Sequence, residues 1–257
     1  MKLALTFDDG PSAWTPAVLE LLREHEARAT FFLIGQRVRE LPEGAREIAA
    51  AGHELGSHTL THPRLTEIPD DEVRAEIVGG VEAFEEVLGE RSPLFRAPGF
   101  HAAERELAIV SELGLEAVFA DVDPEDWRPE VDSHTIFRRV LEGARDGAIV
   151  DLHDGYPPPP TSARDDCTPT VEALEHLLPC LRAEGYELVT LSELRASVPK
   201  YQSVTCSASG ASRRAQLEVE AAAAATPAAS RRAAALSVRS QVKSWSSRPK
   251  WPYAAVF

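Results

Sequence analysis

Residues 2–10, KLALTFDDG, join a short apolar run to a pair of acidic residues. An apolar run such as Leu3–Phe7 that ends at a turn signal is typical of a buried strand. Asp8 and Asp9 stand at the end of this run, and Gly10 follows them as a turn residue. Because side chains alternate along an extended strand, we expect Asp8 and Asp9 to point to opposite sides. The stretch therefore predicts a buried strand that carries acidic groups at its carboxyl end.

Outward from this strand, the chain alternates short apolar runs with longer amphipathic segments as far as about residue 197. The predicted strands are Leu3–Phe7, Ala29–Ile34, Glu54–Ser57, Leu94–Ala97, Ala117–Val122, Ala148–Leu152 and Glu187–Leu191. The predicted helices are Pro16–His25, Arg37–Ala51, Asp70–Leu88, Ala103–Leu113, Ser133–Arg145 and Thr170–Glu184. Strands that alternate with helices in this way predict an α/β protein built on a parallel sheet. The number of strands favours a closed or nearly closed barrel, with an open doubly wound sheet as the competing architecture.

A polar motif directly follows five of the predicted strands. TFDDG ends the first strand, SHTLTH follows the third, FRAPGF the fourth, DVDPEDW the fifth and DLHDG the sixth. In both architectures the carboxyl ends of parallel strands form one face, and that face carries the active site. We therefore expect the five motifs to meet in one site.

The second motif places His58 and His62 four residues apart, just before Pro63. On one turn of helix these positions share a face, so a short helical turn that ends at the proline would aim both rings at one spot. Two histidines with one carboxylate leave open positions on a metal ion, as catalytic sites require. Surface histidines are the alternative. The convergence of the motifs favours a divalent metal, which would make a bound water molecule more acidic.

A hydrolase also needs a base for the water and an acid for the leaving group. Asp8 is placed to serve as the base, and Arg96 could pair with it and keep it ionised. His153 is the candidate acid, since an imidazole can hold and release a proton near pH 7. Asp126 could accept a hydrogen bond from this ring and raise its pKa.

The composition excludes some classes of function. The net charge of −14 argues against a nucleic-acid-binding protein, whose partner demands a basic surface. No apolar run approaches the roughly 20 residues of a membrane span. The apolar stretch in the N-terminal MKLALTFDDG is too short for a secretory signal. These observations predict a cytoplasmic protein as the sequence stands, or a secreted one whose export signal has been removed.

The last 60 residues differ from the rest of the chain. Beyond Val198 there are nine Lys and Arg residues against two Glu residues, and the segment EAAAAATPAAS has no apolar periodicity. We therefore expect a catalytic domain over residues 1–197 and a disordered Ala/Ser/Arg-rich tail over residues 198–257.

The five motifs, in this order, resemble those of the polysaccharide deacetylases with a NodB homology domain (carbohydrate esterase family 4). The resemblance runs from Leu3 to about Leu194 and includes ATFFLIGQRV and GYELVTLSEL. It implies a distorted, incomplete (β/α)7-type barrel. It also implies a hydrolase that removes acetyl groups from N-acetylated sugars, with a chitin-like, chitooligosaccharide-like or peptidoglycan-like carbohydrate as substrate. The implied cofactor is one divalent metal ion, most often Zn²⁺, with Co²⁺, Mn²⁺ and Ni²⁺ as alternatives.

The resemblance assigns the metal side of the site. It implies that Asp9, His58 and His62 are the metal ligands. It further implies that Asp8 is the general base and that Arg96 tethers this base.

The resemblance likewise assigns the acid and the substrate contacts. It implies that His153 is the general acid and that Asp126 orients it. The implied substrate-binding residues are Gly99, whose N–H would help to hold the oxyanion, Trp127, which would line the acetyl pocket, and Leu152.

Two departures from the family pattern bear on the substrate. The third motif has Gly99 and Phe100 where a tyrosine is usual, and Asp151 stands two residues before the acid, where an apolar residue is usual. An unpaired carboxylate against an acetyl methyl group is costly to bury. Either Asp151 turns away, or the acyl pocket is smaller or more polar than usual. These departures favour, as an alternative, a deformylase or cyclic-imide hydrolase of the same superfamily.

Two further alternatives fit the motifs less well. An iron oxygenase would use the same two histidines and carboxylate. It would have no use for Asp8 or for the pair formed by Asp126 and His153. A non-catalytic sugar-binding module has no need to retain the acid, the base and the metal ligands together.

Overall fold

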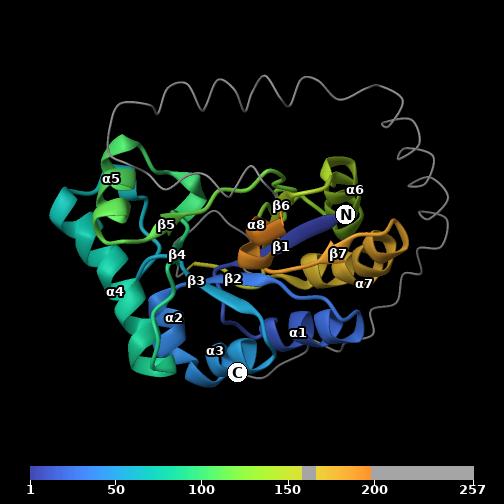
Figure 1. The fold of residues 1–257 in the computed structure, drawn as a ribbon, viewed down its shortest axis with the longest axis horizontal. Helices are drawn as coiled ribbons and strands as arrows, with labels where there is room; N and C mark the ends of the chain where they lie inside the picture. The colour runs from blue at the N-terminus through green and yellow to red at the C-terminus, as the bar shows by residue number, and fades with distance from the viewer. Residues whose placement is uncertain (158–165, 198–257) are drawn as a thin grey trace. The chain divides into compact units, whose positions relative to one another are not determined.

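The computed structural model describes residues 1–157 and 166–197 of the chain. Its strands form one sheet in which every pair is parallel, in the order β5-β4-β3-β2-β1-β6, with β7 paired to the start of β1 (Figure 1). The strands are β1 (Lys2–Asp8), β2 (Thr30–Leu33), β3 (Glu54–Ser57), β4 (Leu94–Phe95), β5 (Glu116–Ala117), β6 (Ala148–His153) and β7 (Glu187–Leu188). The long strand β1 is buried from Leu3 to Asp8, as its apolar sequence predicts, and it pairs with β2, β6 and β7.

The sheet curls into an incomplete barrel rather than lying open. A parallel bridge between Val122 and Val150 joins the segment after β5, at one edge, to β6, at the other edge. This closure confirms the predicted α/β barrel and excludes the open doubly wound sheet.

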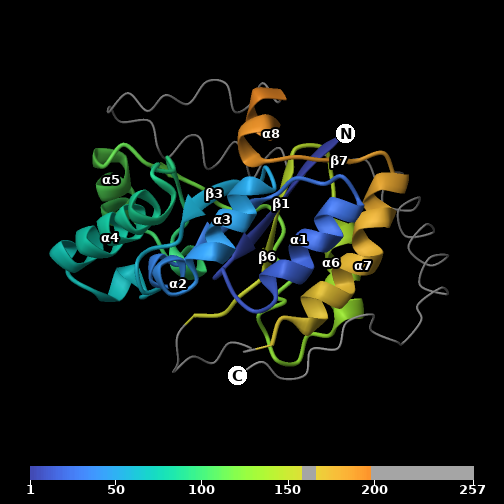
Figure 2. The same cartoon turned by 90° about the horizontal axis from the view of Figure 1, so that it is seen from below.

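Helices cover the outside of the curled sheet. They are α1 (Thr15–Glu24), α2 (Gly35–Glu40), α3 (Pro42–Ala50), α4 (Asp70–Leu88), α5 (Glu104–Glu112), α6 (Ser133–Gly143), α7 (Thr168–Ala183) and α8 (Leu191–Ser197). Figures 1 and 2 show α1, α6 and α7 grouped at one side of the sheet and α4 and α5 at the other. None of the helices in the described part of the chain is both long and apolar enough to cross a membrane.

Three predicted elements differ from the structure by more than two residues at an end, or are divided. The predicted helix Arg37–Ala51 is two helices, α2 and α3, because Pro42 begins a new helix after a break at Leu41. The predicted strand Ala117–Val122 shrinks to β5 and the bridge at Val122. The predicted strand Glu187–Leu191 ends at Leu188, since Leu191 begins α8.

The inside of the barrel changes from apolar to polar along the strands. Its apolar layer consists of Ala4, Phe32, Leu94, Val118, Ile149 and Val189 together with Leu191 and Leu194 of α8, so α8 closes the amino ends of the strands. Nearer the carboxyl ends, Thr6 stands opposite Asp151, and Asp8 stands opposite His153. The strands therefore bring their polar residues to one end of a filled barrel.

The tail expected over residues 198–257 lies outside the described residues. The last described element, α8, ends at Ser197, which is where the change in sequence composition begins.

Candidate active site

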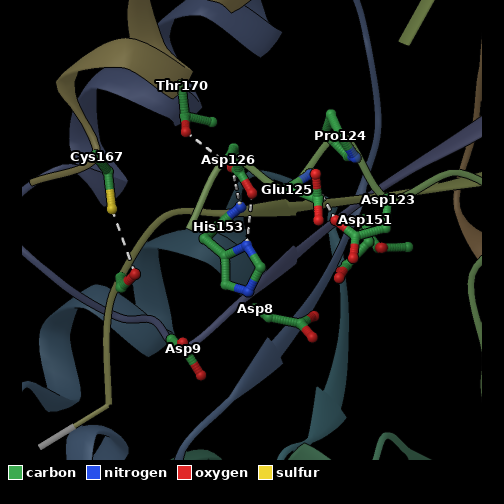
Figure 3. A network of polar contacts seen from close by, with 12 residues as sticks. Asp8, Asp9, Asp123, Pro124, Glu125, Asp126, Asp151, His153, Cys167 and Thr170 are labelled. Atoms are coloured by element: carbon green, nitrogen blue, oxygen red, sulfur yellow. Dashed lines mark hydrogen bonds and ion pairs between the residues drawn. The ribbon is translucent and has the colours of Figure 1, made fainter. Parts of the chain in front are cut away.

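The five sequence motifs meet at the carboxyl ends of the strands, as the topology predicts. Asp8 ends β1 and His153 ends β6. The loops after β1, β3, β4 and β5 contribute the other polar residues of the motifs, Asp9, His58, His62, Arg96 and Asp126. In Figure 3, His153 lies between Asp126 on one side and Asp8 and Asp9 on the other.

The three predicted metal ligands converge on one point. Oδ1 of Asp9 lies 3.5 Å from Nε2 of His58 and 3.3 Å from Nε2 of His62. The same oxygen is buried and has no hydrogen-bond partner within the described residues. A buried carboxylate oxygen without a partner is costly, and a cation among these three groups would satisfy it. The cluster is therefore suited to a divalent metal ion.

The state of His58 supports the same conclusion. Its Nδ1 lies 2.8 Å from the carbonyl oxygen of Arg96. Because a carbonyl only accepts, Nδ1 carries the hydrogen, and Nε2 presents a lone pair to the cluster. Burial, reinforced by the neighbouring His62, lowers the pKa of His58 to about 3, so the ring is held in the neutral form that binds metals.

The two histidines converge from a loop, and the predicted helical turn is wrong. Thr59 and His62 both have φ +66°, in the left-handed region, which interrupts any helix at these positions. Glu76 of α4 holds the loop from outside, because its Oε2 accepts hydrogen bonds from the backbone N–H groups of Leu60 (3.1 Å) and Thr61 (2.8 Å). Contacts with a distant helix, rather than helical hydrogen bonds, therefore bring the rings together.

Asp8 and Asp9 also differ from the expectation that they point to opposite sides. Asp9 has φ +73°, so the chain leaves the extended conformation between the two residues. Oδ2 of Asp8 and Oδ1 of Asp9 consequently lie 3.6 Å and 3.5 Å from the same Nε2 of His58. The left-handed turn at Asp9 places both carboxylates beside the candidate metal site.

Arg96 is fully buried and pairs with Asp8, as the sequence predicts. Its Nη1 donates to Oδ1 of Asp8 at 2.7 Å, and its guanidinium carbon lies 4.1 Å from the centre of the Phe32 ring. Burial raises the pKa of Asp8, and the positive charge of Arg96 opposes this increase. Arg96 thus holds one carboxylate oxygen and leaves the other directed towards His58.

Asp151 lies two residues below His153 on β6, on the same face of the strand. Its Oδ1 accepts a hydrogen bond from Nη1 of Arg96 at 2.7 Å. Burial, together with the charge of Asp8, raises the pKa of Asp151 well above its usual range. Asp8, Asp151 and His153 form a second group of potential ligands, but the guanidinium bonded to both carboxylates disfavours a cation there.

The candidate acid is held at two points by Asp126. Nδ1 of His153 donates to Oδ1 of Asp126 at 2.7 Å, and the backbone N–H of His153 donates to Oδ2 at 2.9 Å. Burial opposes a charge on this ring, but Asp126 outweighs it and raises the pKa of His153 well above its usual range. The pair therefore favours a protonated imidazole, and Asp126 does not engage its Nε2.

Comparison with known proteins places this geometry in a family. A family model described as polysaccharide deacetylase matches residues 1–118. A chitooligosaccharide deacetylase from a Bradyrhizobium strain is 43% identical over 196 residues, which cover 74% of this chain and 89% of that protein. The chain belongs to the polysaccharide deacetylase family.

Two further members agree with this assignment. A peptidoglycan-N-acetylglucosamine deacetylase from Bacillus cereus is 39% identical over 196 residues, which cover 75% of this chain and 87% of that protein. The solved structure of a peptidoglycan deacetylase from Bacillus subtilis has a TM-score of 0.68 at 33% identity, over 76% of this chain and 90% of that chain. The predicted family, the hydrolase class and the curled barrel are thereby confirmed.

The three predicted substrate contacts of this deacetylase-family chain lie in different surroundings. Trp127 and His153 line one small cavity at the mouth of the barrel. Gly99 is exposed in a 3-10 turn with φ +58°. Leu152 is fully buried, and its side chain lies on the opposite face of β6 from those of Asp151 and His153.

Thr170 supports the residue that holds the candidate acid, and the sequence motifs do not include it. Its hydroxyl donates to Oδ2 of Asp126 at 2.8 Å. Thr170 lies in the first turn of α7, 44 residues from Asp126, and no motif in the sequence connects the two.

Proposed function

We propose that this chain is a metal-dependent deacetylase that hydrolyses the N-acetyl group of a glycan containing N-acetylglucosamine. The observation that carries the proposal is the unpartnered, buried Oδ1 of Asp9 between His58 and His62. This cluster lies next to Asp8, which Arg96 holds, and His153, which Asp126 holds. Relatives named chitooligosaccharide deacetylase and peptidoglycan-N-acetylglucosamine deacetylase support the same substrate class.

Asp9, His58 and His62 would hold the metal ion. One oxygen and two nitrogen ligands suit Zn²⁺, and Co²⁺, Mn²⁺ or Ni²⁺ could take its place. When bound, such an ion polarises the amide carbonyl and makes a water molecule more acidic.

Asp8 acts as the general base. The hydrogen bond from Arg96 engages its Oδ1, and Oδ2 faces the cluster, where it accepts a proton from the attacking water. The raised pKa of Asp8 suits this task, because a general base works best with a pKa near the operating pH.

His153 acts as the general acid and transfers the proton of its Nε2 to the departing nitrogen. Asp126 holds Nδ1, which fixes the ring and stabilises the imidazolium. The N–H of Gly99 helps to hold the developing oxyanion, and a donor of this kind typically contributes about 3–4 kcal/mol.

The structure weakens the deformylase alternative. Asp151 favoured a smaller or more polar acyl group only if its carboxylate lined the acyl pocket. Its oxygen instead bonds Arg96, at the level of Thr6 and below the pair formed by Asp8 and His153. An acetyl group therefore does not have to meet an unpaired carboxylate.

The test is an acyl-release assay on metal-reconstituted protein. The substrates are N-acetylglucosamine oligomers, peptidoglycan and N-formyl analogues, with Asp8→Asn as the inactive reference. The proposal is supported if the wild-type protein releases acetate from the glycans and Asp8→Asn does not. A wild-type protein that binds one equivalent of metal and releases formate but no acetate would contradict it.

A further inference from the structure

The turn that follows the acid, Asp154 and Gly155, packs directly against the peptide that joins Asp9 to Gly10. A Cβ on Gly10 would lie only 2.6 Å from Oδ1 of Asp154. A Cβ on Gly155 would lie 2.6 Å from the carbonyl carbon of Asp9 and still closer to its oxygen. Because neither glycine has a side chain, the loops after β1 and β6 can approach each other closely next to the proposed metal ligand Asp9.

Hydrogen bonds reinforce this contact. The carboxylate of Asp154 is fully buried, and its Oδ2 accepts from the hydroxyl of Thr15 at 2.5 Å. The same hydroxyl accepts from the backbone N–H of Ser12 at 2.8 Å. The hydroxyl of Ser12 donates to the carbonyl of Asp154, and the N–H of Asp154 donates to the carbonyl of Asp8 at 3.3 Å.

These contacts surround a residue in a disfavoured conformation. Asp9 has φ +73°, an angle that few residues other than glycine adopt, although Asp tolerates it better than most. Relaxation of Asp9 to an extended conformation would turn its side chain away from His58 and His62. On the β2 side, the N–H of Asp9 donates to the carbonyl of Phe32 at 3.2 Å, and the N–H of Ile34 donates to the carbonyl of Gly10 at 3.1 Å. On the β6 side, the close approach of Gly155 and of the Asp154 carboxylate, which Thr15 holds, supports the turn.

We propose that Asp154, Gly155 and Thr15 form a clamp that fixes the metal ligand Asp9 and thereby sets the metal affinity of the site. They are positioning residues, because they act through the backbone of Asp9. The clamp spans the loop after β1 and the end of β6, so the residues next to the acid also determine where a metal ligand lies. This inference rests on the proposed metal site.

The test compares zinc dissociation constants, measured by competition with a chromogenic chelator, among variants of the full chain. Thr15→Val keeps the shape of the side chain and removes the bridging hydroxyl, and Thr15→Ser restores it. We expect about 10- to 100-fold weaker binding for Thr15→Val, the range typical of partners that orient metal ligands, and binding near that of the wild type for Thr15→Ser. Gly155→Ala should weaken binding as well, because its methyl group meets the Asp9 carbonyl.

Thr30→Val is the matched control. Thr30 is also fully buried and hydrogen-bonded, to Glu54 and to the N–H of Leu191, but it lies in β2 near the closed end of the barrel. The substitution Thr30→Val should lower the melting temperature and leave the zinc affinity unchanged. Equal zinc affinity in Thr15→Val and the wild type would overturn the clamp, and so would equal weakening in Thr30→Val.

Crystal structures of the two Thr15 variants separate failure of the clamp from failure of the metal site. A wild-type chain that binds no zinc contradicts the proposed function. If Asp9 keeps its left-handed conformation in Thr15→Val, the clamp is wrong whether or not zinc binds.

Discussion

Asp8 and His153 are direct partners in the parallel register of β1 and β6. Neighbouring strands lie about 4.8 Å apart, so the proposed base and acid start from adjacent backbone positions at the same level of the barrel. Each is held by a different partner, Arg96 for the base and Asp126 for the acid. The two halves of the mechanism can therefore be perturbed separately.

Alanine at both His58 and His62 should abolish stoichiometric zinc binding and, with it, the hydrolysis. Of the three proposed ligands only Asp9 then remains, which is too few for a catalytic zinc site. Elemental analysis after dialysis measures the bound metal, with His25→Ala, directly after α1, as the control. One equivalent of zinc retained by the double variant would show that the ligands lie elsewhere.

Replacement of His153 by alanine should lower turnover on an N-acetylated sugar by about 10²–10⁴-fold while the metal stays bound. An activated ester should be affected much less, because its leaving group needs no proton. Comparable losses on both substrates would indicate that His153 does not act as the acid.

Asp126→Asn should shift the alkaline limb of the pH–rate profile to lower pH. On the proposed mechanism, activity requires protonated His153 and falls as pH rises through its pKa, which the Asp126 carboxylate holds well above the usual range. The asparagine removes this charge, so the proton is lost earlier. A profile of kcat against pH measures the shift, and an unmoved alkaline limb would argue against control by this pair.

Arg96→Met should destabilise the protein by about 3–5 kcal/mol, since it leaves Asp8 and Asp151 buried without their partner. Urea unfolding measures the loss. Adding Asp151→Leu to this variant should recover part of the stability, because one of the two buried carboxylates is removed. A double variant less stable than Arg96→Met would mean that Asp151 is held by other groups.

Stability should fall as pH decreases from about 6.5 to about 4 because of His53. Burial, with a contribution from Arg28, lowers the pKa of His53 to about 4, and its Nδ1 accepts from the N–H of Ala29 at 3.2 Å. The unfolded chain takes up this proton below about pH 6.5, whereas the folded chain resists it until about pH 4. The stabilisation is thus complete above pH 6.5, and roughly 2–3 kcal/mol of it is lost across this window.

Urea unfolding at pH 7 and pH 5 tests the contribution of His53. His53→Gln should flatten the pH dependence, and His101→Gln at an exposed position should not. An unchanged slope in His53→Gln would assign the effect to other groups.

Truncation after Ser197 should leave the melting temperature and turnover unchanged, because it retains Leu191 and Leu194, which pack inside the barrel. Truncation after Thr190 should lower the melting temperature sharply, since it uncovers this apolar layer. Calorimetry compares the two. A large loss in the longer variant would show that residues 198–257 stabilise the domain.

The sequence predicts the parts of this molecule that depend on periodicity and on strand ends. Apolar runs locate the strands, and parallel topology then brings Arg96 to Asp8 and Asp126 to His153, as observed. The family motifs assign roles to these residues. Predictions of this kind succeed because they require only knowledge of which strand end a residue follows.

Features that depend on one backbone angle or on one distant contact could not be predicted. Nothing in SHTLTHP or TFDDG indicates that Thr59, His62 and Asp9 adopt left-handed angles, since these are imposed from outside the loops. Thr15 and Asp154 are 139 residues apart, and each alone reads as an ordinary turn or helix-start residue. The sequence leaves open whether Asp151 turns away from the acyl group, because nothing in it indicates the hydrogen bond from Arg96.

The apolar layer closed by α8 fills the barrel at the amino ends of its strands. Side chains of β1, β2, β4 and β6 fill the interior below Asp8 and His153, and Leu191 and Leu194 complete the seal. On the proposed function, the glycan and the released acetate must therefore use the same entrance. Acetate held beneath the bound sugar would have to wait until the sugar departs, so product inhibition by the two species should be coupled.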